Sequence, residues 1–130
     1  MLKQASTRKQ GDVGTAYAVS YYARNGFTVS IPLADSQPYD LIVDKDGIGL
    51  KRVQVKTSTK VTPTGHYSVE LRTISNRRGG KLEIRKFSKQ KADILFIVCG
   101  DERMFAIPAD LADGMAQILV TKRFPLYEVK

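Results

Sequence analysis

The sequence has few of the residues and patterns that build disulfides, signal peptides and membrane spans. It contains one cysteine in 130 residues, so no internal disulfide can form, and Cys99 lies in an apolar run that indicates a small core residue. The longest apolar runs, such as residues 94–99, are too short to cross a bilayer, and the N-terminus lacks the apolar core of a secretory signal. We therefore expect a cytoplasmic protein with no membrane span, folded as a single domain over residues 1–130.

Acidic residues are in the minority, because 13 Asp and Glu stand against 21 Lys and Arg and the net charge is +8. The excess gathers between residues 72 and 91, where eight basic residues accompany a single acid, Glu83. The basic members of this strip are Arg72, Arg77, Arg78, Lys81, Arg85, Lys86, Lys89 and Lys91. A solvated basic face would have this composition, and so would a strip that follows nucleic-acid phosphates and associates the protein with the nucleoid.

The order of predicted elements indicates an α/β fold. Helical spacing runs over residues 2–25 and ends at Asn25-Gly26, and a second helix is predicted at 109–119 after Pro108. Strands are predicted at 27–31, 39–43, 50–57, 67–73, 93–99 and 104–107, with a glycine-rich polar loop at 75–80. We expect a central mixed β-sheet flanked by helices, in which the last two strands form a hairpin.

Three polar residues converge if the strands at 39–43 and 50–57 pair antiparallel about a loop centred on Gly47. Positions 40 and 54 then lie opposite each other, with Lys56 just beyond Gln54 on the same face. The valines on either side of Gln54 point to the other face and enter the core. Asp40, Gln54 and Lys56 form an unusual set for one spot on a sheet.

This set suits the hydrolysis of a phosphodiester, which requires charge neutralisation on the phosphoryl oxygens and a strong nucleophile. A divalent ion held by oxygen ligands supplies both, and Asp40 and Gln54 offer such oxygens. Lys56 could orient the attacking water or offset negative charge in the transition state. Asp12 is the best second acid, although an acid near the start of a helix is also favoured by the helix dipole alone.

Asp12, Asp40 and the triplet 54–56, in this order and at these spacings, resemble the PD-(D/E)XK nuclease superfamily. The resemblance covers residues 11–58 and is strongest to the intron-encoded homing endonucleases of cyanobacteria, then to the archaeal Holliday-junction resolvases. The superfamily usually has Glu where this chain has Gln54, and the intron-encoded branch is one that has Gln there. The proline that the family places before its Asp is displaced, because Tyr39 separates Pro38 from Asp40. The resemblance implies a restriction-endonuclease-like core in which Asp12, Asp40 and Gln54 bind Mg²⁺ or Mn²⁺ and Lys56 acts as the polar catalyst.

Residues after the Lys56 strand are expected to contact double-stranded DNA. Phosphate contacts are predicted for Thr57, Ser58 and Lys60, and contacts to guanine edges or to phosphates alone for Arg72, Arg77 and Arg78. The remaining predicted contacts are Lys81, Arg85 and Lys86. His66 could be a general base, but a lone histidine in a loop is more often incidental.

Cutting both strands requires two active sites or a turnaround of one, so we expect a symmetric homo-oligomer, a dimer by the least assumption or a tetramer if the homing resemblance holds. Residues 111–120 could form its surface or belong to the core. The sequence thus predicts a metal-dependent homing endonuclease, with a junction resolvase and a non-catalytic DNA-binding module as alternatives.

Overall fold

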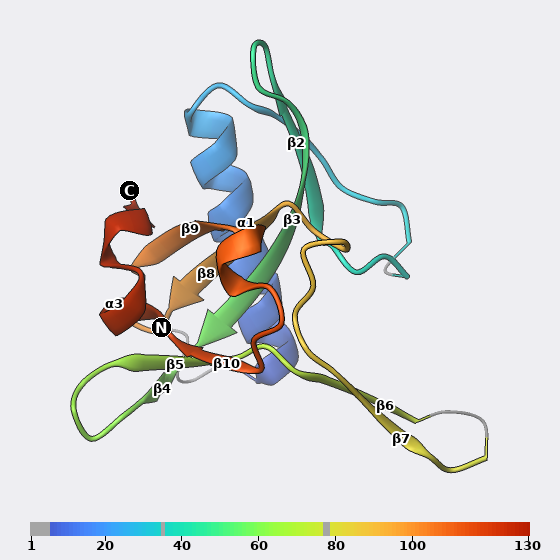
Figure 1. The fold of residues 1–130 in the computed structure, drawn as a ribbon. Helices are drawn as coiled ribbons and strands as arrows, with labels where there is room; N and C mark the ends of the chain where they lie inside the picture. Colours follow the sequence, from blue (N-terminus) through green and yellow to red (C-terminus); the bar gives the residue numbers. More distant parts are fainter. Residues whose placement is uncertain (1–5, 35, 77–78) are drawn as a thin grey trace.

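The structure, a computed structural model, describes residues 6–34, 36–76 and 79–130, and a six-stranded sheet forms its centre (Figure 1). The strands run in the order β1-β2-β3-β8-β9-β11, with β3 and β8 parallel and the other neighbours antiparallel. Their bounds are β1 Thr28–Ser30, β2 Leu41–Lys45, β3 Gly49–Ser58, β8 Ile94–Cys99, β9 Met104–Pro108 and β11 Glu128–Val129. The predicted central mixed sheet with flanking helices is confirmed.

Helix α1 (Thr7–Arg24) covers one face of this sheet. It begins where Ser6 caps it, the Ser6 hydroxyl accepting a hydrogen bond from the Lys9 amide at 3.3 Å, and it ends at Asn25 and Gly26 as the sequence predicts. Ala18 and Tyr22 are buried against Leu41 and other side chains of β2, β3, β8 and β9. None of the helices within the described ranges is long and apolar enough to cross a bilayer.

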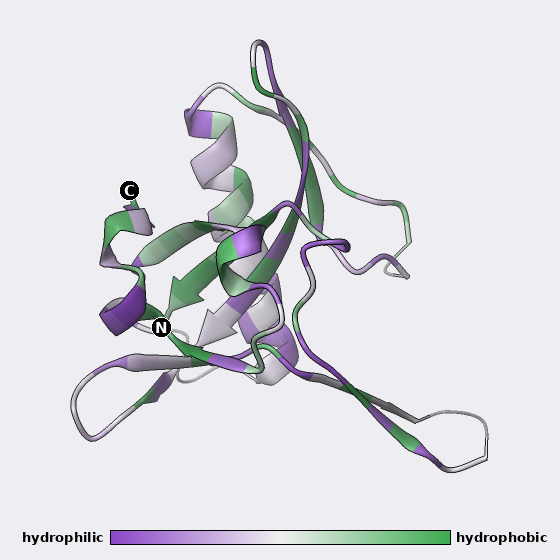
Figure 2. Ribbon diagram, in the orientation of Figure 1, coloured by the Kyte–Doolittle hydropathy of each residue, from purple (hydrophilic) through white to green (hydrophobic). Residues whose placement is uncertain are grey.

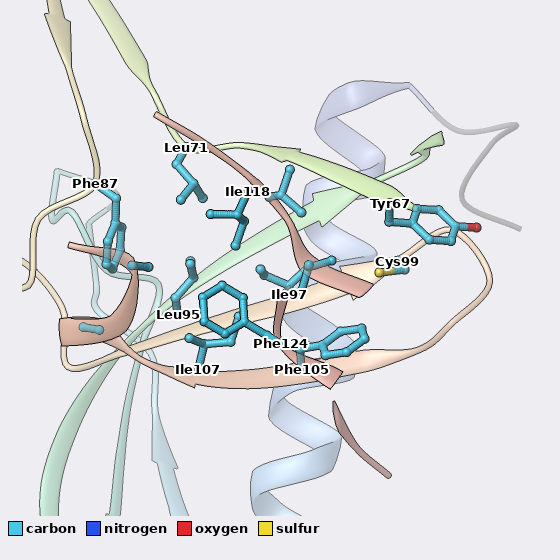
Figure 3. Packing of buried hydrophobic residues seen from close by; sticks show 14 of the residues in the cluster. Tyr67, Leu71, Phe87, Leu95, Ile97, Cys99, Phe105, Ile107, Ile118 and Phe124 are labelled. Carbon is cyan, nitrogen blue, oxygen red and sulfur yellow. The ribbon is translucent and has the colours of Figure 1, made fainter. Parts of the chain in front are cut away.

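The opposite face of the sheet carries a second core, shown in Figure 3. Side chains of β8 and β9 pack there against a three-stranded sheet ordered β10-β5-β4 and against short helices. These elements are β4 Lys60–Val61, β5 Tyr67–Glu70, β10 Gln117–Leu119, α2 Ala109–Ala112, α3 Val120–Arg123 and the 3-10 helix Pro125–Tyr127. Because both faces are covered, β8 is apolar throughout, as parallel strands usually are. Cys99 is buried in this core, as expected.

The parallel pairing of β3 with β8 is fixed at its start by Arg52 and Asp93. The Arg52 guanidinium donates two hydrogen bonds of 3.2 Å to the Asp93 carboxylate, and the Arg52 amide donates a third at 2.8 Å. The Arg52 hydrogen bond lowers the pKa of Asp93 below its ordinary value. These contacts join residues that are 41 positions apart in the chain.

A two-stranded ribbon, β6 (Thr73–Asn76) with β7 (Leu82–Arg85), stands out from the body (Figure 1). The sequence predicts a single strand over 67–73 and a loop at 75–80. The strand ends early and β6 takes residues 75 and 76 of the predicted loop, while residues 79–80 lie in a turn as predicted and residues 77–78 lie outside the described residues. The chain leaves the β5 ladder after Glu70, because the Leu71 and Arg72 amides both donate to the carbonyl of Ala116. The sequence predicts no strand at the position of β7. Its alternating Leu-Glu-Ile-Arg pattern was hidden among the charges of the basic strip.

The helix predicted at 109–119 begins at Ala109 as expected but is wrong beyond Ala112. Helix α2 ends at Ala112, and Gly114, at φ 76°, redirects the chain so that Ile118 pairs with Val69 in a strand. The suggestion that residues 111–120 form an oligomer surface does not hold for the apolar residues Ala112, Ile118 and Val120, because all three are buried in the second core. The predicted core spacing is confirmed for Ile118, holds in part for Met115, and is wrong for Leu111, which is exposed. Gly114 sets the secondary structure here.

Candidate active site where β2 begins

The β2–β3 hairpin brings Asp40 and Gln54 to neighbouring positions. Leu41 pairs with Val53, and the Asp40 amide donates a 2.8 Å hydrogen bond to the Val53 carbonyl. The predicted antiparallel pairing about Gly47 is therefore confirmed. One step further along the same register, position 40 lies beside position 54 at the point where β2 begins.

The Asp40 carboxylate is held in place from one side. Its Oδ2 accepts a 2.7 Å hydrogen bond from the amide of Val55. The residue as a whole is exposed, yet protein surrounds the carboxyl group enough that burial raises its pKa, against the Val55 hydrogen bond and the charge of Lys56, which both lower it. A carboxylate that is partly desolvated and faces one cation, with an open outer side, is suited to bind a divalent ion.

Gln54 and Lys56 are half-buried on the face of β3 opposite to that of the buried Val53. Gln54 lines a cavity of about 240 Å³ that we call the Gln54 hollow. Three cations of the chain that connects β6 to β8, Arg85, Lys86 and Lys91, line it as well. The other lining residues are Pro38, Leu71, Thr73, Phe87 and Ser88. The candidate amide ligand thus lies in the same cavity as part of the basic strip.

Asp40 lines a separate cavity of about 270 Å³, the Asp40 hollow. Its walls come from α1, through Thr15, and from the chain between β1 and β2. The lining residues of that chain are Ile31, Pro32, Leu33, Ala34, Gln37, Tyr39 and Asp40 itself. Two cavities of different character therefore adjoin the paired positions 40 and 54.

Asp12 lies on α1, is exposed, and precedes Thr15 of the Asp40 hollow by three positions on the helix. Helix α1 approaches β3 closely just there, because a Cβ on Gly14 would come within 2.3 Å of the Thr57 methyl group. The structure therefore gathers Asp40, Gln54 and Lys56 on one strand pair and places Asp12 on the adjoining helix. Helix α1 thus reaches the β3 segment that carries the site.

A metal at this site would be held by mixed oxygen ligands. Within the described ranges, no three Asp, Glu, His or Cys side chains gather as a ligand set, so a site at Asp40 would need the Gln54 amide oxygen beside its carboxylates. Carboxylate and amide oxygens are donors that Mg²⁺ and Mn²⁺ prefer. The donor set present therefore fits a hard divalent cation.

The residues predicted to contact DNA divide into outward and inward groups. Lys60, Lys81 and Lys86 are exposed, whereas Ser58 is buried and donates its hydroxyl hydrogen bond to the Ser68 carbonyl. Thr57 packs beneath Gly14. Two of the three residues predicted to follow Lys56 with phosphate contacts are therefore engaged inside the fold.

Two of the four arginines predicted to contact DNA form exposed ion pairs. Arg72 donates to Glu70 at 2.7 Å and Arg85 to Glu83 at 3.1 Å. Exposed pairs of this kind are weak, so either guanidinium can exchange its carboxylate for a phosphate. Arg77 and Arg78 lie outside the described residues. His66 is half-buried, and its ring Nδ1 lies 3.3 Å from the Thr121 hydroxyl. Lys91 was not among the predicted DNA contacts, yet it lines the Gln54 hollow.

Comparison with known proteins places this geometry in context. The PD-(D/E)XK endonuclease family matches residues 5–123 of the chain. A search of curated proteins gave no match. Among solved structures, the chain is similar to a bacterial homing endonuclease, I-Ssp6803I, with 29% sequence identity, a TM-score of 0.76, and coverage of 88% of this chain and 77% of that one.

Proposed function

The chain belongs to the PD-(D/E)XK endonuclease family, and from this premise we propose that it cuts double-stranded DNA at defined sites with a bound divalent cation, Mg²⁺ or Mn²⁺. The observation that carries the proposal is the β2–β3 register, which brings Asp40 beside Gln54 and near Lys56, next to a hollow lined by three cations. One part of this surface offers oxygen ligands and the adjoining part offers positive charge for phosphates. A cation-dependent nuclease requires both.

In this proposal Asp40 and Gln54 hold the cation through their side-chain oxygens, and Asp12 adds a second carboxylate from α1. A divalent ion bound there would neutralise charge on the cleaved phosphate and activate water. Lys56 stabilises the negative charge that builds up on the phosphoryl oxygens. The Val55 amide orients the Asp40 carboxylate through its hydrogen bond to Oδ2.

Gln54 makes Asp40 the principal charged ligand among the paired residues. An amide oxygen is a neutral ligand, so the site carries one negative charge fewer than a Glu would provide. The cations of the Gln54 hollow are then free to hold DNA phosphates rather than a ligand carboxylate. We propose that Arg85, Lys86 and Lys91 bind DNA phosphates in this way.

The likeness to I-Ssp6803I supports a homing role within this proposal, since it extends over 88% of the chain. A homing endonuclease cuts both strands of a defined site, so we propose that two or four copies assemble symmetrically on DNA. An intron-encoded protein of this kind would act in the cytoplasm on the nucleoid.

The test is cleavage of a plasmid library in Mg²⁺ by the wild type, Lys56→Met and, as a matched control, Lys122→Met on the exposed side of α3. We expect discrete linear products, a loss of at least about 10²-fold in rate for Lys56→Met, and no change for the control. Wild-type cleavage by Lys56→Met would show that the site is assigned wrongly. Cleavage confined to four-way junctions would identify a resolvase, and binding without cleavage a non-catalytic module.

A further inference from the structure

The segment after β1 exposes two large apolar side chains close together. Ile31 is 66% exposed and Leu33 106% exposed, with the half-buried Pro32 between them. Figure 1 shows the connection from β1 to β2 standing out from the body, and Figure 2 shows apolar residues along it. Single exposed leucines are common on proteins, but two large exposed apolar residues this close form an apolar projection, in which Pro32 fixes one backbone φ angle.

This projection adjoins the candidate active site. Ile31 and Leu33 line the Asp40 hollow together with Asp40 itself. A phosphodiester bond held against the Asp40 carboxylate would therefore have its neighbouring nucleotide against Ile31 and Leu33. None of the residues that line this hollow is a cation, so it is not built to grip phosphates.

We infer that Leu33 is a wedge that inserts between base pairs next to the cleaved phosphodiester bond, an inference that rests on the proposed function. Apolar side chains of this size unstack base steps and kink the duplex. Pro32 restricts the backbone beside Leu33, so less conformational entropy is lost when the Leu33 side chain inserts. The kink turns the phosphate of the opened step toward Asp40.

A second copy of the chain is the alternative occupant of this apolar surface. A protein that covered Ile31 and Leu33 would also cover the hollow that they share with Asp40. It would close the candidate site to its substrate. The duplex is the occupant that is compatible with catalysis at Asp40.

Plasmid unwinding tests the wedge without requiring the target sequence or cleavage. The full chain is bound to a relaxed plasmid in EDTA, a metal-independent type I topoisomerase is added, and the change in linking number is measured per bound protein. We expect the wild type to unwind the plasmid, Leu33→Ala to lose more than about half of the unwinding, and Leu33→Met to retain it, since Met can also act as a wedge. Leu126→Ala is the matched control, because Leu126 is 92% exposed on a different element and should not affect unwinding.

Several outcomes would overturn the inference. Binding of the wild type without unwinding would do so, as would unwinding by Leu33→Ala equal to that of the wild type. A loss of unwinding accompanied by a smaller oligomer in light scattering would assign Leu33 to a contact between copies. Failure of the wild type to bind the plasmid would overturn both the proposed DNA substrate and the wedge. Unwinding of DNA without cleavage in Mg²⁺ would overturn the catalytic proposal alone, and the wedge would still be supported.

Discussion

The Gln54 hollow and the Asp40 hollow adjoin one strand pair and differ in almost everything that lines them. Three cations, Arg85, Lys86 and Lys91, line the first, and they all come from the long connection between β3 and β8. The second has a carboxylate and no cation, and its walls are α1 and the apolar connection between β1 and β2. We propose that the cations of the Gln54 hollow hold DNA phosphates, while the Asp40 hollow provides the charged ligand of the metal.

Asp40→Asn should have the largest effect on the cleavage rate. Removing the charge of the principal ligand should lower the cleavage rate by about 10²- to 10³-fold, whereas Gln54→Ala removes only a neutral ligand and should cost roughly 10- to 100-fold. The measurement is the single-turnover cleavage rate as a function of Mg²⁺ concentration. Asp46→Asn, in the turn of the same hairpin, is the matched control and should cut normally. A larger loss for Gln54→Ala than for Asp40→Asn would reverse the assignment of the two sides.

Replacing both Lys86 and Lys91 by alanine should weaken binding rather than chemistry. Each lysine that contacts a phosphate contributes about one unit to the salt dependence of binding, so the slope of log K against log salt should fall by about 2. Fluorescence anisotropy with a random duplex in EDTA measures this slope. The double replacement of Lys122 and Lys130 by alanine removes the same charge elsewhere and should leave the slope closer to that of the wild type. An identical slope in both double variants would mean that the Gln54 hollow does not hold phosphates.

The smallest expected effect is on the pH dependence of stability. Of the two paired residues only Asp40 contributes to it, because Gln54 does not titrate. Burial raises the pKa of Asp40 above its ordinary value of 3.8, so the folded protein retains a proton that the unfolded chain has lost. Without metal, Asp40 therefore costs stability as the pH rises from 3.8 through the raised pKa. Asp40→Asn should raise the Tm slightly at pH 7 in EDTA and leave it unchanged near pH 3, as measured by thermal unfolding. A lower Tm for Asp40→Asn at pH 7 would contradict the direction of the shift.

The sequence predicted the β2–β3 hairpin because its signals are local. A glycine turn and alternating valines set the pairing of Asp40 with Gln54 without reference to the rest of the chain. The Gln54 hollow could not be predicted in this way. It combines Pro38 with residues 85–91, which only the folding of the long connection brings together.

Errors elsewhere have equally specific causes. Leu111, Met115 and Ile118 have helical spacing, but Gly114 and the pairing with β5 override it. Ile31 was included in the predicted strand 27–31, but β1 ends at Ser30, so the side chains of Ile31 and Leu33 lie in the connection to β2 and are exposed. Ser58 has a sequence position suited to a phosphate contact, and only the structure shows its hydroxyl donating to Ser68.

The contact between Arg52 and Asp93 has a consequence for the order of folding. The β2–β3 hairpin joins residues close in sequence, so it can form early, whereas β3 meets β8 only after the chain has returned across 41 residues. Lys86 and Lys91 lie on that returning stretch. A partly folded chain can therefore bring Asp40 and Gln54 together before it has the wall that would hold DNA against them. We therefore expect the proposed DNA-binding wall to form after the hairpin, so that cleavage requires the completed fold.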